Sequence, residues 1–196
     1  MNHLMSRMSP SATRMIRMDH THVLSQFHKL TPDTGETVRG AIVRSICAAL
    51  EIHAQLEEEL FYPALRAAGV QSSTLEKSVP EHEQMRRLIG RLRGEQPQAA
   101  QQDTLNELMN IVMHHVADEE TQLLPAAERF LGPERLSELG AQMTERRLAL
   151  AKPRAAELAG DIALAAPAKT ALMAVGALLA GSMLVRALLG RRHAHA

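Results

Sequence analysis

Residues 51–63, EIHAQLEEELFYP, decide the fold of this chain. Here His53 stands four places before Glu57, and Pro63 follows the glutamate by six places. Side chains four apart on a helix project from one face, so the imidazole and the carboxylate can share one ligand. Residues 114–125, HHVADEETQLLP, repeat the arrangement. Two copies of one polar pattern indicate a shared role rather than two unrelated surface pairs.

An internal duplication with an offset of 62 residues underlies this repeat. The matching pairs are His20 with His82, His53 with His115, Glu57 with Glu119, and Pro63 with Pro125. Acidic residues also precede both leading histidines, at Asp19 and Glu81. Self-similarity at a fixed period is typical of a repeated supersecondary unit. We therefore predict a duplicated helical hairpin.

The composition excludes several classes of protein. Lys plus Arg equals Asp plus Glu at 22 each among 196 residues, so no overall field attracts nucleic acid, and we predict no nucleic-acid partner. Cys47 is the single cysteine, which excludes an internal disulfide and a thiolate metal cluster and predicts a buried packing residue. Helix formers are common and β-branched residues are sparse. The predicted fold class is therefore all-α.

Capping and stop signals divide the chain into helices. The predicted helices run over about 11–30, from the Asp33–Glu36 capping box to Ala68, over 78–94 or from about Ser73, from about 97 or 103 to 131, and from 133 to 152. Ser78 with Glu81 has the form of a second capping box. We predict that the first four helices pack as an up-down antiparallel four-helix bundle, followed by an additional C-terminal helix.

In such a bundle, a pseudo-two-fold axis brings the repeated histidines and glutamates together in the interior. A buried carboxylate without a partner is costly or loses its ionisation. No Lys or Arg recurs in both copies near these positions, whereas two divalent cations would neutralise both carboxylates. Four imidazoles and two bridging carboxylates suit two iron ions, with manganese or zinc also chemically compatible.

The pattern of a His, a His-x-x-x-Glu followed by a Pro, and a second set of the same resembles the hemerythrin family, whose members carry the HHE cation-binding domain. The resemblance covers roughly residues 11 to 150. It implies a non-haem di-iron centre in which two glutamates bridge the ions. The metal ligands implied by the motif are His20, His53, Glu57, His82, His115 and Glu119.

The chain departs from the oxygen-carrying hemerythrins near two of these ligands. Arg86 stands where those proteins have a further histidine, and their last carboxylate is an aspartate five places after its histidine. Glu119 is five places from His114 and four from His115, and the duplication favours His115. The six-ligand pattern is more similar to bacterial HHE proteins associated with iron-centre repair, nitric oxide or oxygen responses, and metal handling.

Other polar residues near the motif are predicted to have no ligand role. The histidines in this class are His22, His28 and His114. The glutamates predicted to be solvated charges beside the site are Glu58, Glu59 and Glu120, with contact to a ligating imidazole as the weaker alternative. Pro63 and Pro125 are predicted to bend or end their helices one turn past the site.

The remaining segments flank the domain. Residues 1–10 are predicted to be a flexible N-terminus, 11–152 the hemerythrin-like domain, and 153–169 a linker. Residues 170–190 form an apolar stretch close to the about 20 residues that span a bilayer. We predict a hydrophobic tail helix that anchors a cytoplasmic domain to the membrane. An extra helix packed on the domain or on another subunit is the alternative.

The sequence therefore favours a non-haem di-iron protein that binds or senses a small diatomic ligand, oxygen or nitric oxide, or that stores and donates iron. No catalytic residues are indicated, and metal binding is favoured over enzymatic turnover. Two alternatives stay open, a membrane-tethered helical interaction module without metal and a di-iron oxidoreductase. The sequence carries no signature of the oligomeric state.

Overall fold

The computed structural model describes residues 9–94, 98–155 and 159–161, and all regular elements within these ranges are helical. The elements are α2 (Ala12–Phe27), α3 (Glu36–Leu56), η1 (Glu57–Phe61), α4 (Tyr62–Ala67), α5 (Ser73–Arg93), α6 (Gln98–Asp118), η2 (Glu119–Leu123), α7 (Leu124–Ala151) and η3 (Lys152–Arg154). The elements η1 and η2 are π-helical turns, and η3 is a short 3-10 helix. The predicted all-α class is confirmed.

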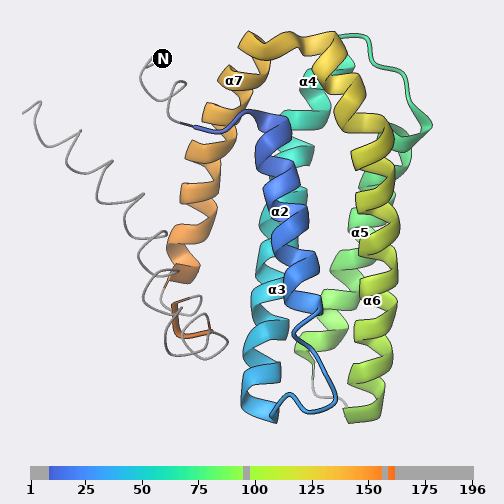
Figure 1. The fold of residues 1–196 in the computed structure, drawn as a ribbon, viewed down its shortest axis with the longest axis vertical. Helices are drawn as coiled ribbons and strands as arrows, with labels where there is room; N and C mark the ends of the chain where they lie inside the picture. The colour runs from blue at the N-terminus through green and yellow to red at the C-terminus, as the bar shows by residue number, and fades with distance from the viewer. Residues whose placement is uncertain (1–8, 95–97, 156–158, 162–196) are drawn as a thin grey trace, which may run out of the picture. The chain divides into compact units, whose positions relative to one another are not determined.

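The chain forms two compact units. Among the described residues, the larger unit comprises 9–29, 46–94 and 98–153, and the smaller comprises 30–45, 154–155 and 159–161. Within the larger unit, α2 packs along α7, and α5 packs along α6 (Figure 1). Within the smaller unit, the Arg44 guanidinium binds both carboxylate oxygens of the buried Asp161, with Nε at 3.0 and 3.1 Å.

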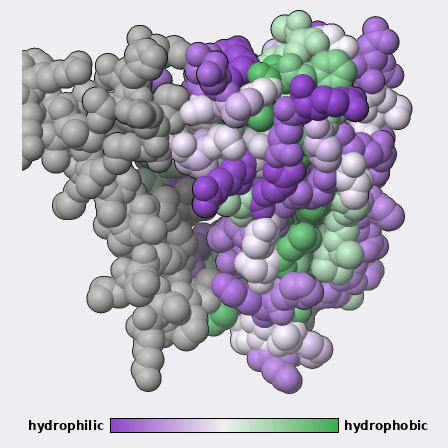
Figure 2. Space-filling model, turned by 45° about the horizontal axis from the view of Figure 1, so that its top comes forward, coloured by the Kyte–Doolittle hydropathy of each residue, from purple (hydrophilic) through white to green (hydrophobic). Residues whose placement is uncertain are grey.

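The core of the larger unit is built from the apolar stripes of its helices. In α2, Met15, Ile16 and Val23 are buried, and the Ser11 side chain caps the helix by accepting from the backbone N–H of Arg14. Met15 and Ile16 pack in one cluster with residues of η1, α4, η2 and α7. The face drawn in Figure 2 is mostly hydrophilic over the described residues, with smaller hydrophobic patches, as expected when these stripes face inward.

Each long central helix passes through a π-helical turn that starts at a repeated glutamate. The backbone N–H of Tyr62 bonds to the carbonyl of Glu57, five residues back, and Leu124 bonds to Glu119 in the same way. The two turns are related by the 62-residue offset of the duplication. Pro63 and Pro125 lie in the first turn of the α-helix that follows, where their missing N–H costs little. The helical path therefore continues past both prolines, so the alternative that they end the helices is wrong.

Two other predicted boundaries differ from the structure. The helix α5 begins at Ser73 with Ser72 as its N-cap, so the earlier predicted start is confirmed and the capping box at Ser78 is wrong. Ser78 is buried, and its hydroxyl donates to the carbonyl of Thr74. The predicted break at Gly132 is present as a kink inside α7, where Gly132 has a φ of 71°.

Several predicted segments lie outside the described residues. These are most of the N-terminus 1–10, most of the linker 153–169, and the whole tail 170–190. Among the described helices, none combines the length and the apolar character needed to cross a bilayer. Cys47 is buried as predicted, and burial raises the pKa of its thiol to about 11.

Gly140 of α7 lies where the backbone of the N-terminal segment crosses closely. A Cβ added there would lie 2.1 Å from the carbonyl oxygen of Pro10 and 2.9 Å from the backbone nitrogen of Ala12. We expect Gly140→Ala to destabilise the fold by about 1–3 kcal/mol, because both contacts are with backbone that cannot give way locally. Thermal unfolding measures the effect.

Gly90 of α5 provides the matched control, since a Cβ there would meet no atom within 4 Å. Gly90→Ala is expected to stabilise the protein by about 0.5–1 kcal/mol through helix propensity alone. Equal shifts in the two variants would show that the close crossing at Gly140 does not constrain the fold.

Candidate metal centre

Four histidines and two glutamates converge in the interior of the larger unit, and all six come from the repeated motif. They project from α2 (His20), α3 (His53), η1 (Glu57), α5 (His82), α6 (His115) and η2 (Glu119). None of the six is more than 5% exposed, and both glutamates are fully buried. The structure therefore brings together every residue that the sequence predicted as a metal ligand.

The six residues form two groups that share Glu57. The first group is His20, His53, Glu57 and Glu119, and the second group is Glu57, His82 and His115. In each group, one nitrogen or oxygen per residue lies within 4.8 Å of the others. The Oε2 atom of Glu57 is 3.2 Å from Nε2 of His53 and 3.4 Å from Nε2 of His82, so one carboxylate faces both groups.

Four buried polar atoms of the first group lack hydrogen-bond partners within the described part of the chain. The unpartnered atoms there are Nε2 of His20, Nε2 of His53, Oε1 of Glu57 and Oε2 of Glu119. Buried polar atoms are nearly always hydrogen-bonded, so four such atoms in one place need a common explanation. A cation is a group that can accept lone pairs from imidazole and carboxylate at once. The residues present therefore fit a metal ion.

The outward ring nitrogen of each of the four histidines faces a carboxylate. We call these four residues the outer carboxylates, and the Nδ1 to oxygen pairs are His20 with Glu120 (2.9 Å), His53 with Asp19 (3.4 Å), His82 with Glu58 (2.9 Å) and His115 with Glu81 (2.9 Å). A carboxylate accepts from N–H, which assigns a proton to Nδ1 and, whenever the ring is neutral, leaves the Nε2 lone pair directed inward. The outer carboxylates thereby orient all four imidazoles with Nε2 toward the interior of the centre.

Glu58 and Glu120 both contact imidazoles of the centre, so the weaker alternative of the prediction is the one that holds for them. The duplication contained the signal, since Glu58 matches Glu120 and Asp19 matches Glu81 at the 62-residue offset. Glu59 is exposed as predicted, and it pairs with Arg146.

A cationic side chain binds each outer carboxylate. The pairs are Arg147 with Asp19, Arg86 with Glu58 (2.7 Å), Lys77 with Glu81 (3.8 Å) and Arg17 with Glu120 (3.1 Å). Burial works against ionisation of Asp19, but hydrogen bonds from His53 and Arg147 hold the pKa of Asp19 well below its usual range. Each of the four imidazoles thus contacts a carboxylate that is itself paired with a cationic side chain.

Without a metal, the negative charges of Glu57 and Glu119 would repel each other, so the two carboxyl groups do not ionise equally easily. Burial and the charge of Glu119 raise the pKa of Glu57 well above its usual value. Burial also opposes ionisation of Glu119, but His115 and the other nearby imidazoles lower the pKa of Glu119. Burial lowers the pKa of His53 to about 4, so this ring is neutral and free to donate a lone pair at pH 7.

Tyr62 is part of the centre, although no pattern in the sequence indicated it. The single hydroxyl proton of Tyr62 is shared between Oε2 of Glu57 (3.0 Å) and Oε1 of Glu119 (2.8 Å), and the side chain is buried. Burial and the two carboxylate charges raise the pKa of Tyr62 well above its usual value, so the phenol keeps its proton. Its ring stacks on His82 with the centroids 5.8 Å apart.

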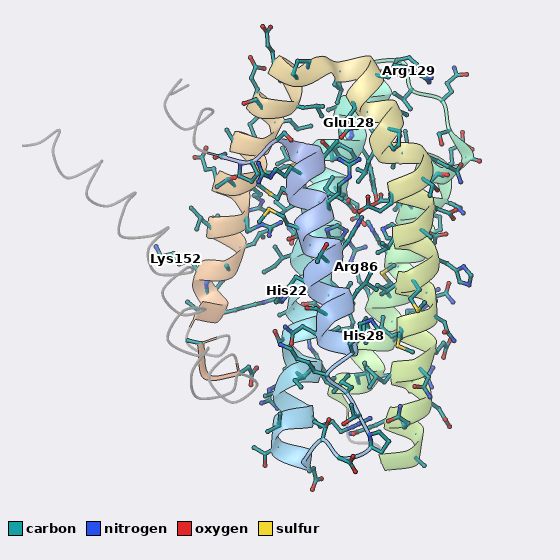
Figure 3. All side chains as sticks on the ribbon, in the orientation of Figure 1. His22, His28, Arg86, Glu128, Arg129 and Lys152 are labelled. Atoms are coloured by element: carbon teal, nitrogen blue, oxygen red, sulfur yellow. The ribbon has the colours of Figure 1, made fainter. Side chains whose placement is uncertain are left out.

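The histidines predicted to have no ligand role lie outside the centre. His22 and His28 are exposed on α2 and its C-terminal end (Figure 3). His114 is exposed on α6, whereas His115 is buried and faces the centre, which agrees with the choice favoured by the duplication. Arg86, at the position of the further histidine of oxygen carriers, binds Glu58 instead (Figure 3).

Comparison with known proteins gives one family and one relative. The family described as hemerythrin HHE cation binding domain matches residues 11–127. A protein of Nostoc sp. (strain PCC 7120), named DNA nickase, is 32% identical over 121 residues, which cover 61% of this chain and 34% of that protein. The chain therefore spans about a third of the length of this curated relative. No solved structure matches the chain.

Proposed function

This chain belongs to the hemerythrin HHE cation-binding domain family, and we propose that it is a non-haem di-iron protein with one ion in each of the two groups. The observation that carries the proposal is the set of four unpartnered buried atoms in the first group, together with the position of Glu57 between both groups. The ligands would be His20, His53, Glu57, His82, His115 and Glu119, with Glu57 shared between the two groups.

The donor set supports iron as the metal. Imidazole and carboxylate donors suit iron, and manganese or zinc would fit the same atoms. The two fully buried glutamates supply negative charge that two divalent ions would neutralise. The repeat supports an up-down antiparallel arrangement of the four ligand-bearing helices, because a duplicated hairpin packs most simply in that way.

The burial of the centre restricts the class of ligand. Iron supplies a position at which oxygen or nitric oxide can bind. Side chains no more than 5% exposed surround that position, so only a very small molecule reaches it without rearrangement of the fold. We therefore propose that the protein binds or senses a small diatomic ligand, or that it stores and donates iron.

Metal analysis tests the proposal directly. The full chain, purified after expression with iron, is expected to contain about two iron atoms, because each group supplies at least three donors. The absorption spectrum of the native protein would report the iron centre. A folded protein that takes up no iron, manganese or zinc on reconstitution would instead favour a helical interaction module without metal.

The outer carboxylates are expected to raise metal affinity. Glu81→Ala removes the carboxylate 2.9 Å from Nδ1 of His115 and is expected to weaken metal binding by about 10- to 100-fold. Glu83→Ala, two residues along α5 and exposed, is the matched control and should bind metal as the parent does. Competition with a metal chelator measures both. Equal affinities in the two variants would show that Glu81 does not orient the ligand.

The DNA-nicking activity in the name of the Nostoc protein is not expected of this chain. A phosphodiester is far larger than a diatomic ligand, and the candidate centre is closed to it by burial of all six residues. The balance of 22 basic and 22 acidic residues also provides no general attraction to DNA. We expect the metal-loaded protein to leave supercoiled plasmid intact in a nicking assay. Nicking that Glu57→Gln abolishes would contradict this expectation.

A further inference from the structure

One break in the duplication lies directly beside the two central glutamates. Tyr62 corresponds to Leu124 at the 62-residue offset, and each follows its π turn directly. The six candidate ligands and the positions of the outer carboxylates, by contrast, are matched between the copies. The hydroxyl of Tyr62 is therefore a polar group present on one side of the centre and absent from the other.

The π turn explains how Tyr62 reaches the carboxylates. In an α-helix, a residue five places on is rotated by about 500°, which turns its side chain about 140° away from the first. The wider π turn brings position 62 back toward the face of Glu57, as the 3.0 Å hydrogen bond between the two side chains shows. The same backbone feature in the second copy presents the apolar side chain of Leu124.

The hydroxyl of Tyr62 leaves the two groups with different donor sets. One oxygen of Glu119, Oε2, lies 3.3 Å from Nε2 of His20 in the first group. The other oxygen, Oε1, accepts the Tyr62 hydrogen bond at 2.8 Å. The second group contains only one carboxylate, that of Glu57. Its two imidazoles direct their inward nitrogens toward each other, with Nε2 of His82 3.1 Å from Nε2 of His115.

We propose that Tyr62 makes the two metal positions unequal, so that the first group binds its ion more tightly and is filled before the second group. This inference rests on the proposed function, since it requires that both groups bind cations. Two carboxylates and two imidazoles would hold the first ion. The second ion would have to compete with the Tyr62 hydroxyl for Oε1 of Glu119.

Titration of the metal-free full chain with Zn²⁺ tests the inference, with calorimetry for affinity and native mass spectrometry for stoichiometry. The parent is expected to bind two ions in separate steps that differ at least about ten-fold in affinity. Tyr62→Phe removes the competing hydroxyl and should strengthen the second step on the order of ten-fold, bringing the two steps together. Tyr62→Leu, which copies position 124, should do the same and provides a second variant if the phenylalanine does not fold.

Two further variants assign the steps to the groups. His115→Ala should remove the weak step and keep the tight one, whereas His53→Ala should remove the tight step. Thr104→Val is the matched control for loss of a buried hydroxyl, because Thr104 donates to the carbonyl of Ala100 rather than to the centre, and it should leave both steps unchanged.

The possible outcomes separate this inference from the proposed function. No binding of Zn²⁺ by the parent would refute the proposed function itself. Two equal steps in the parent, or loss of the tight step in His115→Ala, would overturn the inference while leaving a two-metal protein. A weaker second step in both Tyr62 variants would also overturn it, because the hydroxyl would then assist the second ion instead of competing with it.

Discussion

Glu57→Gln is expected to abolish binding of both metal ions and yet leave the metal-free protein at least as stable as the parent. Glu57 is the residue shared by the two groups, so its loss removes a ligand from each ion. The loss of affinity should exceed the about 10- to 100-fold that changes outside the ligand set cost. In the metal-free protein, burial and Glu119 raise the pKa of Glu57, which means that its charged form is unfavourable there. A neutral amide of the same shape avoids that cost.

Metal analysis and thermal unfolding with a chelator measure the two halves of this prediction. Glu59→Gln is the matched control, because Glu59 lies two residues away but is exposed and pairs with Arg146. It should retain both ions. Retention of two ions by Glu57→Gln, or clear destabilisation of its metal-free form, would show that Glu57 has a structural role instead of the ligand role proposed.

The six candidate ligands were predictable because the duplication tests each position against a second copy. A single His-x-x-x-Glu has many explanations, whereas His53 with Glu57 and His115 with Glu119 at a common offset have few. The choice of His115 over His114 came from the same comparison. The abundance of helix formers and the scarcity of β-branched residues similarly predicted the helical class.

The outer carboxylates and Tyr62 were not predictable by α-helical spacing. Position 62 is on the wrong face relative to Glu57 in an α-helix and reaches it only through a π turn. Glu58 and Glu120 each bind a histidine of the opposite copy, so no spacing within one helix indicates them. Their equivalence under the duplication marks them as a pair but does not say which way they point.

The capping box predicted at Ser78 and Glu81 shows how tertiary contacts override a local pattern. A serine followed three places later by a glutamate fits a helix start, and Ser72 at the real start lacks that partner. In the folded chain, Ser78 is fully buried and Glu81 contacts His115. Both residues lie inside the helix, where Ser78 donates to a backbone carbonyl and Glu81 binds a histidine of the centre, so the pattern does not mark a helix cap.

Removal of metal is expected to destabilise the protein strongly. Any ion that binds only the folded state adds about 4 kcal/mol of stability when its free concentration is about 1,000 times its dissociation constant. Two ions should therefore contribute about 8 kcal/mol under such conditions. Thermal unfolding of the iron-loaded protein, with and without a chelator, measures the difference. An unfolding temperature that stays the same when the chelator is added would show that no bound ion stabilises the folded state.

The destabilisation should grow as the pH rises from about 6.5 to 9. Burial opposes protonation of His20, but hydrogen bonding and the charge of Glu119 raise the pKa of His20 to about 9 in the metal-free fold. This pKa exceeds the unfolded value of about 6.5, so the resulting stability is complete below pH 6.5 and is lost as the pH passes through 9. The raised pKa of Glu57 acts in the same direction, because the folded state then favours its protonated form. In the loaded protein, metal ions replace these protons and bind more tightly as the protons become scarcer. The gap in unfolding temperature between loaded and metal-free protein should therefore widen with pH, and a gap that stays constant or narrows would show that cations do not take the place of protons at His20 and Glu57.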